Sequence, residues 1–120
     1  MSSNLSANHS LALWHQVTLN TLHAQGPDLS ARQMALLLTV YLEETPHTVR
    51  GLAQQLRVSK PAVTRALDRL CDLGLLRRKT DDNDRRSVLI QRTVKGSVFL
   101  SEFGDAIQRV STQLSASGPT

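Results

Sequence analysis

The stretch from Thr48 to Leu73, TVRGLAQQLRVSKPAVTRALDRLCDL, constrains the fold most, because it predicts two short helices joined by a tight turn. Thr48 can cap the first helix and Ser59 the second, since each side-chain oxygen can accept a hydrogen bond from a free N–H of the first turn. Pro61 suits the first turn of the second helix, where its missing N–H removes no helical hydrogen bond. The stretch is therefore a candidate helix-turn-helix.

The second of these helices has one apolar and one polar face. Six apolar residues recur at spacings of three and four, which places them on one stripe of a helix: Ala62, Val63, Ala66, Leu67, Leu70 and Leu73. The opposite face carries Lys60, Pro61, Thr64, Arg65, Asp68 and Arg69. We expect the apolar stripe to be buried and the mainly basic face to be open to a partner.

The positive charge of the chain is concentrated around this motif. The formal net charge is +4 over 120 residues, and ten of the fourteen Lys and Arg residues lie between Arg57 and Arg92, with only five acidic residues in the same window. Such a local excess favours an anionic partner. The single cysteine, Cys71, permits no disulfide within the chain, and no signal peptide or long apolar run is present. These features predict a reducing, cytoplasmic setting without a membrane partner.

The residues before the motif predict a tail, two helices and a short strand. Residues 1–9 are polar and lack an apolar period, which predicts a disordered tail. Residues 10–24 carry a broad helical stripe, and Ser30 can cap a strongly apolar helix that ends before Pro46. Residues 47–49 are extended enough for a short strand. The second of the two helices should be the central packing element.

Beyond the motif, the pattern changes from helical to extended. Gly74 can end the helix in a left-handed conformation. Residues 75–80 and 87–92 predict two strands, and the Asp- and Asn-rich residues 81–86 between them predict a charged hairpin turn. Thr93 can cap a last helix that reaches Leu114, followed by a disordered tail over 115–120.

Together these elements predict a mainly α fold with a small β-hairpin wing (α+β), which is a winged helix-turn-helix. One winged-helix domain is expected over residues 10–114, flanked by dimerisation helices. At this length the chain is most simply one domain.

The segment VRGLAQQLRVSKPAVTRALDRLCDLGLLRRKTDDNDRRSVLIQRTVKG resembles the MarR family of bacterial winged-helix transcription regulators, and the likeness runs from about residue 29 to 96. Five residues align with family positions: Thr64 and Arg65 with the recognition-helix pair, Asp84 and Arg86 with the wing signature, and Thr93 with the start of the next helix. The resemblance implies binding to double-stranded DNA. It also implies a homodimer, and in many members a small phenolic effector, which the sequence does not identify.

Two features depart from the family pattern. Arg92 stands where the family usually has Leu, and the apolar pattern ends near Leu114, before the last dimerisation helix that the family usually has. The geometry of the dimer therefore stays open.

The chemistry of the residues supports the same function without the family name. An Arg side chain can pair bidentately with guanine O6 and N7 in the major groove, and Thr can meet a thymine methyl group. We therefore expect Arg65 to be the base reader, and we expect the wing tip to reach the minor groove or phosphates, with Asp84 orienting one guanidinium. The predicted DNA-binding residues are Ser59, Lys60, Pro61, Thr64, Arg65, Arg69, Arg77, Arg85 and Arg86.

Several residues have a simpler interpretation. Arg69, Arg78 and Arg92 can each be solvated or paired with Asp68, Asp72 or Asp82. Cys71 is expected to be a packing thiol rather than a redox sensor. The four His residues lack ligand spacing, and no nucleophile-base pair or phosphate-binding glycine loop is present, so no metal, cofactor or enzymatic activity is predicted.

The apolar stripes at the two ends of the chain are the candidate dimer interface, because together they exceed what a small winged core can cover. The predicted dimerisation residues are Leu11, Trp14, Phe103, Ile107 and Val110. A homodimer would favour a pseudo-palindromic site. The alternative is a monomer that pairs only on DNA. Two other functions stay open, a winged-helix protein-interaction module and an RNA-binding domain. RNA binding is the less favoured, because it more often uses exposed aromatic side chains for stacking, and the few aromatic residues here fall on apolar stripes.

Overall fold

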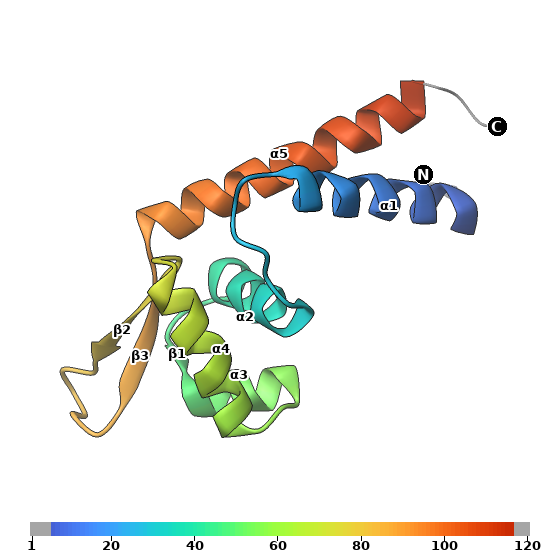
Figure 1. Cartoon of the computed structure of the whole chain (residues 1–120). Helices are drawn as coiled ribbons and strands as arrows, with labels where there is room; N and C mark the ends of the chain where they lie inside the picture. Colours follow the sequence, from blue (N-terminus) through green and yellow to red (C-terminus); the bar gives the residue numbers. More distant parts are fainter. Residues whose placement is uncertain (1–5, 117–120) are drawn as a thin grey trace. The chain divides into compact units, whose positions relative to one another are not determined.

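The computed structural model describes residues 6–116, which form five helices and a small antiparallel sheet (Figure 1). The elements in order are α1 (Ala7–His23), α2 (Ala31–Leu42), β1 (His47–Thr48), α3 (Val49–Leu56), α4 (Lys60–Asp72), β2 (Leu76–Thr80), β3 (Val88–Arg92) and α5 (Val94–Ala116). The predicted fold class, a winged helix-turn-helix, is confirmed. The chain forms two compact units, one over residues 29–100 and one from α1 and the part of α5 after residue 100.

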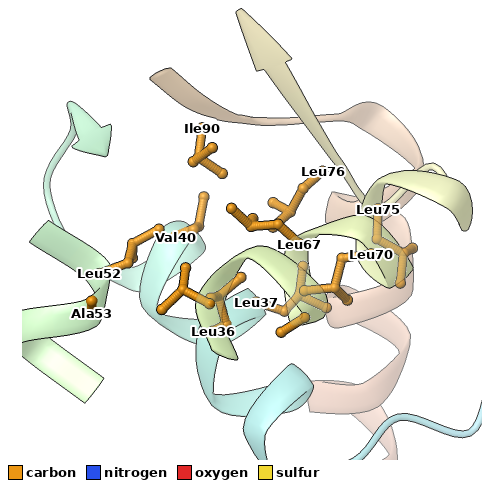
Figure 2. Close-up of a cluster of buried hydrophobic side chains, with 12 residues drawn as sticks. Leu36, Leu37, Val40, Leu52, Ala53, Leu67, Leu70, Leu75, Leu76 and Ile90 are labelled. Carbon is orange, nitrogen blue, oxygen red and sulfur yellow. The ribbon is translucent and has the colours of Figure 1, made fainter. Parts of the chain in front are cut away.

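The core of the larger unit lies between α2, α3, α4 and the sheet. Figure 2 shows side chains of α2 and α4 directed toward one another, with β-strand residues closing the cluster. The buried cluster consists of Leu36, Leu37, Val40, Leu52, Ala53, Val63, Ala66, Leu67, Leu70, Leu75, Leu76 and Ile90. The sequence predicted α2 as the central packing element, but α2 supplies three of these side chains and α4 supplies four, so the two helices share the centre of the core.

The sheet has three strands in the order β1-β3-β2, all antiparallel. In the wing, Leu76 pairs with Arg92 and Thr80 with Val88. The predicted short strand after α2 is confirmed at His47 and Thr48, but Val49 already belongs to α3. This strand ties the start of the helix-turn-helix to the wing.

The predicted helix starts are confirmed by hydrogen bonds at the caps. The Thr48 hydroxyl accepts from the Gly51 N–H at 3.0 Å, and the Ser59 hydroxyl accepts from the Ala62 N–H at 3.2 Å. Gly74 has a φ of +76°, the left-handed conformation that glycine adopts without strain. The recognition helix therefore begins and ends where the sequence indicates.

The smaller unit contains α1 and the C-terminal part of α5 (Figure 1). Val17 and Val110 are buried there, whereas Leu11 and Trp14 are 66% and 61% exposed. The predicted tail over residues 1–9 is wrong at its end, because the Ser6 hydroxyl accepts from the His9 N–H and starts α1 at Ala7. Residues 1–5 lie outside the described residues.

At the other end, α5 continues through Ala116, so the tail predicted over 115–120 is wrong for its first two residues, and 117–120 lie outside the described part. Within residues 6–116, no helix is long and apolar enough to cross a membrane.

Candidate nucleic-acid interface

The exposed face of α4 presents the polar side chains that the sequence assigned to it. Lys60, Thr64, Arg65 and Arg69 are all exposed, while the apolar residues between them are buried against α2 and α3. The Ser59 hydroxyl caps the helix by accepting a hydrogen bond from the Ala62 N–H. Pro61 is exposed and lies in the first turn. The helix thus offers a mainly basic face, interrupted by Asp68, whose position is fixed by the core beneath it.

The turn between α3 and α4 depends on a feature that the sequence did not reveal. Arg57 adopts the left-handed conformation (φ 58°, ψ 44°), and the Val58 N–H then donates to the Ala53 carbonyl at 3.1 Å. This is the usual way to end a helix, but the position normally holds Gly or Asn. The missing glycine explains why the sequence pattern gave no signal for it.

The Asp84 carboxylate helps to order the wing tip. Asp84 Oδ1 accepts from the Arg86 N–H at 3.1 Å, and Oδ2 accepts from the Ser87 hydroxyl at 3.3 Å. The same Oδ1 lies 3.6 Å from Arg86 Nε, which belongs to the guanidinium nearest to the carboxylate that was predicted to orient one. Because the Arg86 side chain remains 95% exposed and Arg85 is exposed beside it, both cations are open to a ligand.

The basic residues of β2 alternate between the two faces of the sheet. Arg78 extends toward α4, where its Nη2 donates to Asp68 Oδ1 at 2.6 Å. Arg77 lies on the other face, and its Nε donates across the strands to Gln91 Oε1 at 3.0 Å. The structure therefore does not bring the Arg77 guanidinium to the face of β2 that meets α4, although Arg77 was predicted with the α4 residues as one DNA-binding set.

Arg92, whose surroundings the sequence left open, lies against the end of α2. It is an exposed residue that also bonds to this helix end, because its Nε donates to the Val40 carbonyl at 3.1 Å and its Nη2 to the Glu43 carbonyl at 3.3 Å. Its guanidinium also lies 5.8 Å from the centre of the Tyr41 ring. The sequence placed Tyr41 only on an apolar stripe and gave no signal for this contact.

Cys71 is half-buried on α4, and burial raises the pKa of its thiol, with smaller opposing and reinforcing effects from Arg78, Asp68 and Asp72. A thiol with a raised pKa carries little thiolate at neutral pH. Within residues 6–116, no group of His, Cys, Asp or Glu side chains could hold a metal ion.

The predicted dimerisation residues do not share one environment. Leu11 and Trp14 are exposed, Phe103 and Ile107 are half-buried, and Val110 is already buried within the chain. Val110 therefore packs inside the smaller unit and offers no free surface of its own.

Solved structures share this arrangement. The regulator BldR from Sulfolobus solfataricus is 28% identical, with a TM-score of 0.63 over 88% of this chain and 71% of that one. A mutant of E. coli MarR is 25% identical, with a TM-score of 0.68 over 94% and 79%. A mutant of S. aureus MepR bound to an oligodeoxyribonucleotide is 22% identical, with a TM-score of 0.76 over 94% and 78%, and shows likeness of fold.

The sequence model of the MarR family matches residues 27–87, slightly more than half of the chain. This range includes the helix-turn-helix, β2 and the wing tip with Asp84. The helix order, the three-stranded sheet and the wing agree with that match. The chain belongs to the MarR family.

Proposed function

We propose that this protein is a sequence-specific regulator of transcription that binds double-stranded DNA. The observation that carries the proposal is the exposed polar face of α4, where Lys60, Thr64, Arg65 and Arg69 lie opposite a fully buried apolar face. A helix of this kind fits the major groove of B-DNA. The MepR structure with a bound oligodeoxyribonucleotide has the same fold, which supports the proposal.

In this proposal the N-terminal half of α4 reads the bases. Arg65 is an exposed residue within the first two turns of α4. Its guanidinium can donate to guanine O6 and N7 at the same time. Thr64 beside it can bring its methyl group against thymine. Lys60 and the Ser59 hydroxyl lie at the helix start, where contacts with phosphate oxygens set the register on the duplex.

The wing supplies contacts beside the major groove. Arg85 and Arg86 extend from the tip, and Asp84 limits the conformations of the Arg86 side chain before any ligand binds. Less entropy is then lost when that guanidinium enters a minor groove or meets a phosphate. Arg77, which is hydrogen-bonded to Gln91, would contact only DNA that reaches the outer face of the sheet.

The proposed assembly is a cytoplasmic homodimer on a pseudo-palindromic site. Two exposed residues of α1, Leu11 and Trp14, are the strongest candidates for its interface, since large apolar side chains rarely stay exposed together without a partner. Two-fold symmetry would place the two α4 helices about one DNA turn apart.

Selection from random duplex DNA tests the proposal and identifies the site together. The full chain should enrich an inverted repeat, and its affinity should fall about 10³-fold or more between low and moderately high salt if six or more phosphates are contacted. No enrichment of any duplex sequence would reject the proposal. An affinity that did not change with salt concentration would favour the alternative, a protein-interaction module, because an apolar interface releases few counterions.

A further inference from the structure

The last turn of α2 holds the end of β3 through Arg92. The Arg92 guanidinium donates to the carbonyls of Val40 and Glu43 at 3.1 and 3.3 Å. Carbonyls at this end of a helix have no partner within the helix and carry partial negative charge, so a cation is well placed there. The Tyr41 ring lies 5.8 Å below the guanidinium and adds a third contact from the same turn.

The same turn also holds the base of the other wing strand. The Tyr41 hydroxyl accepts from the Thr93 N–H at 3.0 Å and lies 3.0 Å from the carbonyls of Leu75 and Thr93, to either of which it can donate. Leu75 directly precedes β2, and Thr93 directly follows β3. Both strands of the wing are therefore fixed at their base to Val40, Tyr41 and Glu43 at the end of α2.

We propose that Arg92 is a positioning residue, which fixes the wing relative to α4 and so determines how much the wing tip contributes to DNA binding. This inference rests on the proposed function. It assigns Arg92 no contact with DNA, because two of its nitrogens are already bonded to α2 and it lies at the base of the wing. The strand from Val88 to Arg92 separates it from the tip by about 14 Å at about 3.4 Å per residue.

Arginine suits this role better than other side chains at the same position. Its planar group can donate to two carbonyls and lie over a ring at the same time, whereas lysine offers a single ammonium. A leucine at this position would have no donor at all. The base of the wing is thus held by an interaction that an Arg92→Leu substitution would remove.

The first test measures the wing without DNA. Amide hydrogen exchange of the full chain should become faster over residues 76–80 and 88–92 in the Arg92→Leu variant, while α4 amides stay as slow as before. Arg92→Lys should give an intermediate rate. Arg109→Leu, which removes the same charge from an exposed site on α5, serves as the control and should change neither segment. Unchanged exchange in the wing of Arg92→Leu overturns the inference, whatever the DNA result.

The second test uses the preferred duplex and a double-mutant cycle. Arg92→Leu should lower affinity about tenfold in the wild-type background but less than about twofold once Arg85 and Arg86 are both alanine, because its effect acts through them. An equal loss in both backgrounds, together with a smaller salt slope, would mean that Arg92 itself meets phosphate and would overturn the inference. If the wild-type chain bound no duplex, the proposed function would fail, and the exchange result would show separately whether the anchor exists.

Discussion

Tyr41 and Thr93 lie 52 residues apart in the sequence, yet the Tyr41 hydroxyl accepts a hydrogen bond from the Thr93 N–H at 3.0 Å. This contact joins the end of α2 to the start of α5, and Gly96 makes room for it. A Cβ atom at Gly96 would overlap both the Tyr41 hydroxyl and the Leu75 carbonyl oxygen. The residue is therefore glycine because of a close approach, not because of its backbone conformation.

Tyr41→Phe should lower the free energy of unfolding by about 1–3 kcal/mol, because it leaves the Thr93 N–H without its acceptor in a half-buried site. The ring beneath Arg92 is kept, so the change isolates the hydroxyl. Chemical denaturation measures the effect. Thr39→Val is the matched control, since the Thr39 hydroxyl donates only to a carbonyl of its own helix, and it should change stability by less than about 0.5 kcal/mol. Equal effects of the two variants would contradict the prediction.

Arg65→Ala should reduce sequence preference more than non-specific affinity. The exposed position of Arg65 on α4 makes it the expected base reader, and loss of one bidentate base contact costs about 1–3 kcal/mol of discrimination. Affinities for a set of duplexes that differ by single base pairs provide the measurement. A variant that ranked those duplexes as the wild-type chain does would show that another residue reads the site.

Arg86→Ala should weaken binding to most duplexes by a similar factor and reduce the slope of log affinity against log salt by about one. The physical reason is the loss of one exposed cation at the wing tip, whose side chain is 95% exposed and free to meet a phosphate. Arg109→Ala on α5 is the control for charge alone and should leave the slope unchanged. If the two variants had the same slope, the wing would not belong to the contact surface.

The sequence predicted the larger unit well because its signals are local. The caps at Thr48 and Ser59, the apolar stripe of α4 and the left-handed Gly74 each depend on neighbouring residues, and each lies where it was expected. The roles of Tyr41 and Arg92 could not be predicted, because their partners come from segments about 50 residues away and are mostly backbone groups. Backbone partners leave no pattern in the sequence.

Cys71 should react slowly with iodoacetamide in the folded protein. Burial raises the pKa of its thiol, so at a given pH less of it is the reactive thiolate, and the rise of the alkylation rate with pH should occur at higher pH than in the unfolded chain. Mass spectrometry over a pH series, with and without denaturant, gives the two profiles. Faster alkylation of the folded protein than of the unfolded chain would indicate an activated thiol instead of a packing residue.

Replacing both Leu11 and Trp14 by Glu should convert a dimer into a monomer. Their side chains are 66% and 61% exposed and lie one turn apart on α1, so charges there would be buried in any interface that uses this face. Sedimentation at micromolar concentration gives the mass. Leu42→Glu is the matched control, because Leu42 is a leucine of α2 that is 77% exposed, and it should leave the mass unchanged.

Point substitutions test the dimer better than removal of residues 94–120. Such a deletion would also remove Phe99 and Leu100, which pack against the core of the larger unit, and would confuse loss of folding with loss of assembly. A monomer mass for the unaltered chain at the same concentration would reject the dimer. The DNA-binding proposal would then require that two monomers pair only when both are bound to the duplex. In that case the two copies should bind cooperatively.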